Sequence, residues 1–300
     1  MLDFAHLHGI VPPLVTPLNA DETVDEPGLR RLVRYALKAG VHGVFALGST
    51  GEFAALPDEE RKKAAEIVVS EVAGAVPVFV GTGGAGTRLA IRQAQMAQQA
   101  KADALVVLLP YYYRTVSAEE QHRHFETVIK NSDLPVLLYN IPQLTKDVLS
   151  LEVVEMLREN PRVAGMKDSS EDFEYFQALM KMAGASFRLF QGSEALAGAS
   201  LLMHAHGAVL GIANLAPGLC VNLYNAAKQE NAEEVRRSQN ILNELRRIYH
   251  VEGSTPIGSL KEALSMIGIC QPYTTSPLAR PSAAARARIE GEVKRFRDQF

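Results

Sequence analysis

The chain has 300 residues, and its 31 lysines and arginines nearly balance 34 aspartates and glutamates, which leaves a formal net charge of -3. Hydrophobic residues make up 47%, so the composition is that of a globular protein and excludes disorder and fibrous repeats. The weak charge argues against a protein that binds duplex nucleic acid. No apolar run approaches the roughly 18–20 residues needed to cross a bilayer.

Two further features bear on the compartment. The N-terminal residues show neither a cationic start nor a long apolar stretch, so no secretory signal is predicted. The two cysteines, Cys220 and Cys270, lie outside any CxxC motif. We therefore expect a cytoplasmic protein without a disulfide framework or a cysteine-held metal.

Short apolar runs, each ending in Gly, Pro, Ser or Asn, alternate with longer amphipathic segments. Eight such runs cover residues 10–17, 43–49, 77–83, 104–110, 135–142, 163–169, 187–193 and 207–214. They are apolar at odd and even positions alike, which is typical of strands buried on both faces of a parallel sheet. Their starts lie about 20–34 residues apart, which leaves room for one helix in each unit.

The intervening segments 58–73, 87–99, 117–130 and 150–159 have helical periodicity. Ser117 followed by Glu120 predicts a capping box at the start of the third. Eight strand–helix units predict an α/β fold, a (β/α)8 TIM barrel, with an open doubly wound sheet as the competing interpretation. The segments 219–229, 232–249, 257–267 and 283–300 are also predicted to be helical, and we read the last 85 or so residues as wholly helical. We expect a barrel domain over residues 1–230 and a helical domain over residues 231–300.

A barrel of this kind places functional residues at the carboxyl ends of its strands. Of eleven lysines, Lys167 is the one that we place within an apolar strand. Burial disfavours the ammonium form, and a free amine attacks a carbonyl to form a Schiff base. Asp168 is a poor ion-pair partner, because neighbours in a strand point to opposite faces. A lysine paired with some other carboxylate remains the structural alternative.

Other strand ends carry hydroxyl groups. The turn that contains Ser49, Thr50 and Gly51 offers amides and hydroxyls that suit a carboxylate, although a plain βα turn accounts for it equally well. Tyr139 ends the fifth run, where a phenol could transfer protons. The tyrosines at 111–113 could serve packing alone.

Three patterns point to other functions but lie in the wrong context. Residues 81–86 match GxGxxG, but they follow the third predicted strand rather than the first. His204 and His206 have a metal-like spacing but precede the eighth strand, at the opposite face, and His122 and His124 lie on a helix. We expect neither a nucleotide nor a metal ion.

Three motifs together resemble a known family. GSTGE at 48–52, YNIP at 139–142 and GMKDS at 165–169 are similar, in order and spacing, to the signatures of the dihydrodipicolinate synthase / N-acetylneuraminate lyase family. The resemblance runs from about residue 9 through the helical tail. It implies a (β/α)8 barrel with a C-terminal helical domain, usually homotetrameric. It also implies a covalent imine between a lysine and a 2-keto acid, commonly pyruvate.

The resemblance also implies roles for single residues. Lys167 is the Schiff-base lysine, and Tyr139 moves protons at the reacting oxygen. Ser49 and Thr50 correspond to the hydroxyl pair that binds the keto-acid carboxylate and links to Tyr139. Tyr112 resembles a tyrosine that enters from a neighbouring subunit. Gly192 and Val209 fall where backbone groups line the pocket.

Departures from the family pattern bear on the substrate. Leu144 occupies the place where the synthases carry an arginine for the second substrate's carboxylate. Of the acidic pair found in neuraminate lyases after the strand-seven glycine, Glu194 is present and its neighbour is Ala195. Glu194 and Ser169 are our candidates for binding substrate hydroxyls.

These departures favour a lyase that joins or releases pyruvate and an aldehyde, acting on a 2-keto-3-deoxy sugar acid. Four alternatives stay open. They are a dihydrodipicolinate synthase condensing pyruvate with aspartate semialdehyde, a 2-keto-3-deoxy acid dehydratase, an N-acetylneuraminate lyase and a non-catalytic pyruvate-binding regulatory relative.

Overall fold

The fold is a barrel of parallel strands. The computed structural model describes residue 4, residues 7–115 and residues 117–300. Over these residues, eight strands pair in parallel in the order β1-β8-β7-β6-β5-β4-β3-β2. They are β1 (Gly9–Ile10), β2 (Val44–Ala46), β3 (Val78–Thr82), β4 (Ala104–Leu108), β5 (Val136–Asn140), β6 (Val163–Asp168), β7 (Arg188–Gln191) and β8 (Gly207–Ala208).

The two end strands of this order close the barrel. Pro13 forms a parallel bridge with Phe45, whose backbone N–H donates to the Pro12 carbonyl at 3.0 Å. The predicted (β/α)8 barrel is therefore confirmed, and the open doubly wound sheet is wrong. The first run forms a strand of only two residues, because Pro12 and Pro13 have no N–H with which to extend a ladder.

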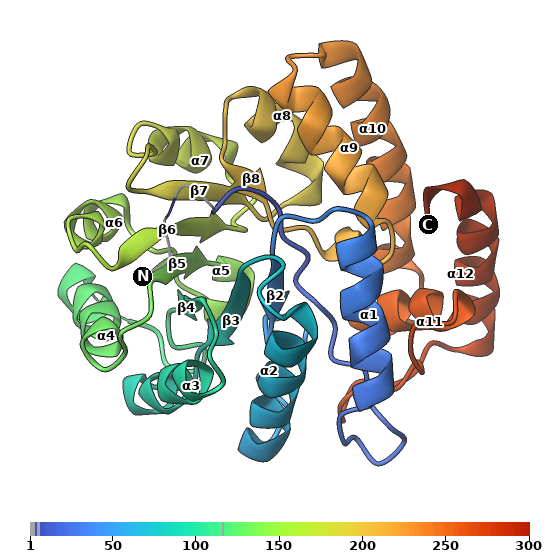
Figure 1. Cartoon of the computed structure of the whole chain (residues 1–300), viewed down its shortest axis with the longest axis horizontal. Helices are drawn as coiled ribbons and strands as arrows, with labels where there is room; N and C mark the ends of the chain where they lie inside the picture. The colour runs from blue at the N-terminus through green and yellow to red at the C-terminus, as the bar shows by residue number, and fades with distance from the viewer. Residues whose placement is uncertain (1–3, 5–6, 116) are drawn as a thin grey trace.

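Helices surround the strands (Figure 1). They are α1 (Glu26–Lys38), α2 (Asp58–Val72), α3 (Thr87–Gln99), α4 (Ala118–Lys130), α5 (Pro142–Thr145), α6 (Leu151–Arg158), α7 (Phe173–Met180), α8 (Ala197–Leu202) and α9 (Pro217–Lys228). Local sequence sets their starts. The Ser117 hydroxyl accepts from the Glu120 N–H at 3.3 Å, which is the Ser117 half of the capping box predicted there.

The C-terminal helices lie together on one side of the barrel, beside α1 and α9 (Figure 1). They are α10 (Ala232–Leu245), the 3-10 turn η4 (Arg246–His250), α11 (Pro256–Met266), α12 (Ala283–Arg295) and the 3-10 turn η5 (Arg297–Gln299). The expectation that this region is wholly helical was wrong, because residues 267–282 contain no helix. Prolines at 272, 277 and 281 explain why the helix does not continue. The division at residue 230 stays a prediction.

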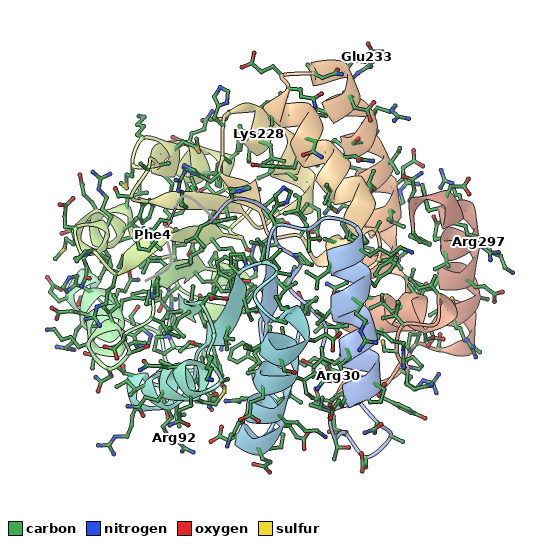
Figure 2. The ribbon with its side chains drawn as sticks, viewed as in Figure 1. Phe4, Arg30, Arg92, Lys228, Glu233 and Arg297 are labelled. Carbon is green, nitrogen blue, oxygen red and sulfur yellow. The ribbon has the colours of Figure 1, made fainter. Side chains whose placement is uncertain are left out.

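Apolar side chains fill the barrel and the layer between strands and helices. Phe45, Phe125 and Phe190 are among the largest that are fully buried. Charged side chains such as Arg92, Glu233 and Arg297 lie at the periphery instead (Figure 2). In the described part of the chain, no helix is long and apolar enough to cross a membrane.

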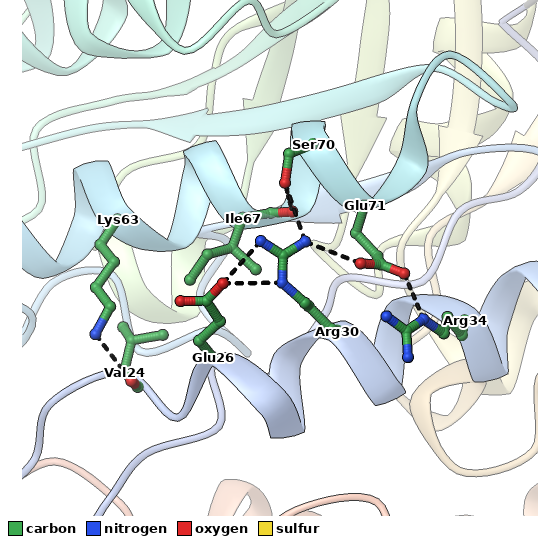
Figure 3. Close-up of polar contacts among 8 residues, drawn as sticks. All are labelled: Val24, Glu26, Arg30, Arg34, Lys63, Ile67, Ser70 and Glu71. Carbon is green, nitrogen blue, oxygen red and sulfur yellow. Dashed lines mark hydrogen bonds and ion pairs between the residues drawn. The ribbon is translucent and has the colours of Figure 1, made fainter.

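A charged cluster joins the first two helices (Figure 3). Arg30 of α1 bonds Glu26 on its own helix at 2.7 Å and Glu71 of α2 at 2.9 Å. Arg34 contacts the same Glu71 carboxylate, which lowers the pKa of that group through hydrogen bonds from both arginines. Because Arg30 and Arg34 are partly exposed, each pair contributes at most about 1 kcal/mol.

Candidate active site

A cavity of about 330 Å³ opens at the carboxyl ends of the strands. Loops after β1, β2, β5, β6, β7 and β8 line it, together with η4 and α11 from the C-terminal region. It brings together eight residues that the sequence singled out. They are Ser49, Thr50, Tyr139, Lys167, Ser169, Gly192, Glu194 and Val209.

Lys167 and Tyr139 meet inside the barrel. They are register partners on the neighbouring strands β6 and β5, so their side chains emerge side by side. The Lys167 ammonium or amine donates to the Tyr139 hydroxyl at 3.0 Å, and the two residues are only 5% and 3% exposed. Below them the barrel interior is apolar, and the Lys167 nitrogen lies 5.2 Å from the centre of the Phe45 ring. The Lys167 nitrogen and the Tyr139 hydroxyl thus face the cavity, with apolar side chains beneath them.

The Asp168 carboxylate hydrogen-bonds to neighbouring polar side chains rather than to Lys167. Its carboxylate accepts from the Asn140 amide at 2.8 Å and from the Ser170 hydroxyl at 2.9 Å. Burial raises the pKa of Asp168, and these hydrogen bonds oppose that effect. The alternation of side chains along β6 explains why neighbouring Lys167 and Asp168 face different surroundings.

The turn after β2 forms one end of the cavity. The Gly51 N–H donates to the Gly48 carbonyl at 3.0 Å, and the Thr16 hydroxyl donates to the Gly51 carbonyl at 2.7 Å. Gly51 itself lies behind the cavity, where an added Cβ would come within 2.9 Å of the Leu14 carbonyl oxygen. The Ser49 hydroxyl is buried and has no hydrogen-bond partner among the described residues. A buried hydroxyl without a partner is costly, so this hydroxyl is available for a hydrogen bond to a bound molecule.

Glu194 and Tyr249 form another polar part of the cavity. Glu194 accepts from the Ile212 N–H at 3.2 Å, and burial raises the pKa of its carboxyl. The buried Tyr249 hydroxyl lies beside it, since both groups flank the position that a Cβ on Gly211 would take, at 3.2 and 3.0 Å. Burial, and then the charge of Glu194, raise the pKa of Tyr249. The sequence did not reveal Tyr249, because nothing local shows that a tyrosine of the C-terminal helices reaches the barrel.

Acidic side chains outnumber basic side chains in the lining of the cavity. Of the residues that the structure describes there, Lys167 is the one cation, whereas Glu171 and Glu194 are acids. Glu171, Ser193 and Gln143 are polar lining residues to which the sequence analysis assigned no role. Gln143 donates to the Ser169 carbonyl at 2.9 Å. These residues lie outside the motifs that the sequence analysis identified, and only the closed barrel brings them together.

Besides Gly51, two predicted site residues lie outside this cavity. Tyr112 is 66% exposed and packs edge-on against the ring of Tyr113, with ring centres 5.0 Å apart. Leu144 is 51% exposed and lines a neighbouring apolar cavity of about 380 Å³. That cavity shares Ser49, Ile141 and Ile257 with the first, so the two are adjacent.

Packing accounts for the patterns that point to other functions. A Cβ on Gly81 would lie 1.9 Å from the Leu47 carbonyl oxygen, so this glycine allows close approach of the backbone. His124 is buried, with Nε2 3.0 Å from the Leu108 carbonyl oxygen. His206 accepts from the Leu189 N–H at 3.1 Å, and burial lowers the pKa of each histidine to about 4. Across the described ranges, no group of three or more His, Cys, Asp or Glu residues could hold a metal ion.

The sequence and the fold are similar to those of known proteins. Residues 6–295 match the model of the dihydrodipicolinate synthetase family. An uncharacterized DapA-like lyase of Halobacterium salinarum is 36% identical over 287 residues, which are 96% of this chain and 93% of the relative. YagE of Escherichia coli, provisionally named a 2-dehydro-3-deoxy-D-gluconate aldolase, is 36% identical over 95% of this chain and 97% of its own.

Solved structures agree. Dihydrodipicolinate synthase from Bacteroides thetaiotaomicron superposes with a TM-score of 0.91 at 37% identity, covering 96% of this chain and 98% of that one. YagE, solved in complex with pyruvate, has the same TM-score at 33% identity, covering 97% and 98%. With a family model that matches nearly the whole chain and a shared barrel, the chain belongs to the dihydrodipicolinate synthetase family of lyases.

Proposed function

We propose that the chain is a class I aldolase that forms or cleaves the carbon–carbon bond between pyruvate and an aldehyde. Its preferred substrate is a 2-keto-3-deoxy sugar acid, and Lys167 acts through a covalent imine without a metal or nucleotide. The observation that carries the proposal is the buried Lys167–Tyr139 hydrogen bond of 3.0 Å, in one cavity with the unpartnered Ser49 hydroxyl. An amine, a phenol and a carboxylate site are the three groups that this chemistry needs.

The substrate binds by its carboxylate at the turn after β2. The Ser49 and Thr50 hydroxyls line the cavity there and donate to the carboxylate, while Gly51 supports the turn from behind. This places the adjacent ketone over the Lys167 nitrogen. Gly192 and Val209 line the cavity and leave space for the substrate.

The reaction begins with neutral Lys167. Its amine adds to the ketone, and the hydroxyl of the resulting carbinolamine leaves as water with the proton of Tyr139, which gives a protonated imine and the phenolate form of Tyr139. Tyr139 takes the proton from the C4 hydroxyl as the C3–C4 bond breaks. The bond electrons pass into the imine, so the products are an enamine and a free aldehyde. Protonation at C3 and hydrolysis of the imine release pyruvate and restore the amine.

The lining charges favour a neutral aldehyde. A second carboxylate, as in aspartate semialdehyde, would meet Glu171 and Glu194 and no free cation among the described lining residues. Leu144, at the place of the synthase arginine, offers no hydrogen bond. Hydroxyl groups of a sugar-derived aldehyde, by contrast, suit Ser169, Glu194 and Tyr249. This supports a 2-keto-3-deoxy sugar acid over the synthase reaction.

We also propose that the enzyme is a cytoplasmic homotetramer in which Tyr112 of one subunit completes the proton relay of another. The exposure of Tyr112 in the single chain supports a role at an interface. Tyr112→Phe should then slow turnover with little effect on stability. Unchanged turnover would contradict the relay.

Borohydride reduction with pyruvate, followed by intact mass measurement, tests the imine. A covalent adduct is expected on the wild-type protein and is lost in Lys167→Ala. Lys62→Ala, which changes a lysine that is 56% exposed on α2, is the matched control and should retain the adduct. No adduct on the wild-type protein would remove the aldolase function and leave a non-catalytic relative.

A panel of substrates then separates the remaining functions. Pyruvate release is measured from 2-keto-3-deoxygluconate and from N-acetylneuraminate, and condensation is measured with aspartate semialdehyde. Loss of water without pyruvate release would identify a dehydratase. We expect the highest kcat/KM for pyruvate release from 2-keto-3-deoxygluconate.

A further inference from the structure

A second buried lysine lies outside the catalytic cavity. Lys167 is the one lysine on the described strands, as the sequence predicts, but Lys261 on helix α11 is also buried and has no exposed surface. Its ammonium pairs with the carboxylate of Glu52, whose side chain is 1% exposed. A weak signal was present, since Lys261 and Glu262 are the charged residues of an otherwise uncharged helix.

The pair connects three distant parts of the chain. Glu52 also accepts from the N–H and the hydroxyl of Thr275, at 2.7 and 2.8 Å. Lys261 donates in addition to the Tyr273 carbonyl at 2.7 Å. The turn after β2, helix α11 and the segment between α11 and α12 are therefore joined at one buried point.

The Glu52–Lys261 pair lies next to the Ser49–Thr50 turn, where we propose that the substrate carboxylate binds. The Glu52 N–H donates to the Ser49 carbonyl at 3.1 Å, so the backbone that carries the Ser49 hydroxyl is bonded to the residue of the ion pair. Glu52 has a φ of 59°, a left-handed conformation that is unfavourable for a residue with a side chain. On the other side, Ile257 and Leu260 of α11 line the cavity, and Leu260 immediately precedes Lys261.

A buried ion pair is a poor device for stability alone. Removing two charges from water costs free energy, and an apolar pair of similar size often stabilises a fold as well or better. Burial lowers the pKa of Lys261, and the charge of Glu52 opposes that effect. The pair instead fixes the position of the Glu52 carboxylate, because a carboxylate held by three hydrogen-bond donors has few alternative positions.

We propose that Glu52 and Lys261 are positioning residues that hold the Ser49–Thr50 turn against α11, and so set the affinity for the keto-acid carboxylate. For the identity of that carboxylate the inference rests on the proposed function. Neither residue touches the substrate. The C-terminal helices thereby act on the first step of the reaction, the binding of the keto acid.

The test separates positioning from stability. Lys261→Met leaves the Glu52 charge unpaired and should destabilise the protein, whereas Glu52→Gln/Lys261→Met leaves a neutral pair and should recover much of that loss. Borohydride trapping is measured against pyruvate concentration, beside urea unfolding. We expect the half-saturating pyruvate concentration to rise about tenfold in both variants, the effect of one weakened hydrogen bond to a charged group. Trapping at saturating pyruvate should persist.

Glu262→Gln is the matched control, because it removes a buried carboxylate of the same helix that pairs with Arg286 at 2.9 Å and not with the turn. It should alter unfolding and leave the half-saturating concentration unchanged. If the double variant binds pyruvate as the wild type does, the pair is merely structural and the inference is overturned. If Lys261→Met does not fold, the double variant decides. An absent adduct in the wild type removes the proposed function, and this inference with it.

Discussion

Replacing Tyr139 by phenylalanine is the sharpest test of the chemistry. The change removes one oxygen, which accepts a hydrogen bond from Lys167 at 3.0 Å in a site where both residues are at least nine-tenths buried. The ring stays, so packing against Phe45, with ring centres 6.5 Å apart, is retained. The loss is thus confined to a hydrogen bond and a proton acceptor.

The expected fall in kcat follows from the loss of this proton acceptor and its hydrogen bond. General base catalysis contributes about 10²–10⁴-fold, and a fall of this size corresponds to about 3–5 kcal/mol in the activation free energy. We expect kcat for cleavage of 2-keto-3-deoxygluconate to fall by this factor. Imine formation needs the Lys167 amine, and water can supply the proton that Tyr139 would give, so borohydride trapping of pyruvate should persist in Tyr139→Phe.

Pyruvate release is followed by coupling to lactate dehydrogenase and recording NADH absorbance. Tyr35→Phe is the control, since that hydroxyl donates to the Leu215 carbonyl at 2.7 Å and does not line the catalytic cavity. A fall in kcat of less than about threefold in Tyr139→Phe would refute the role of Tyr139 as base, since it lies far below the effect of a general base.

Three further predictions concern the cavity and the core. Gly192→Ala places a Cβ 2.0 Å from the Ser169 hydroxyl, so kcat/KM should fall, and adding Ser169→Ala should restore part of it; an unchanged single variant would contradict this. Glu194→Gln should lower kcat/KM for the sugar acid about tenfold by weakening one charged hydrogen bond. It should leave pyruvate trapping on Lys167 unchanged, and an equal loss of trapping would oppose a role in binding the aldehyde portion. Burial holds the pKa of His124 at about 4, below its ordinary 6.5, so the unfolded chain binds this proton more readily. Stability is therefore full above pH 6.5 and falls toward pH 4, by about 2 kcal/mol between pH 7 and 5. Urea unfolding should show a smaller pH dependence in His124→Gln, and an equal dependence would assign the effect to other groups.

Much of the site could be predicted from the sequence, because a barrel brings the residues at the carboxyl ends of its strands together. Lys167 and Tyr139 end apolar runs, and the ends of parallel strands meet at one face of a barrel. Their direct contact could not be predicted in the same way. It depends on the register between β5 and β6, which shifts between Val136 and Leu137. A shift of one residue would turn one of the two side chains out of the barrel.

The sequence by itself determined the alternation of strands and helices, the barrel and the group of strand-end residues around Lys167. These follow from local periodicity and from the one topology that eight parallel units close. Tertiary structure alone decided that Tyr249 reaches Glu194, that Lys261 lies buried against Glu52, and that Tyr112 faces outward in the single chain. The reason is physical. The periodicity of a helix shows that one face is buried, but which groups that face meets depends on how the C-terminal helices pack against residues some 200 positions earlier in the chain.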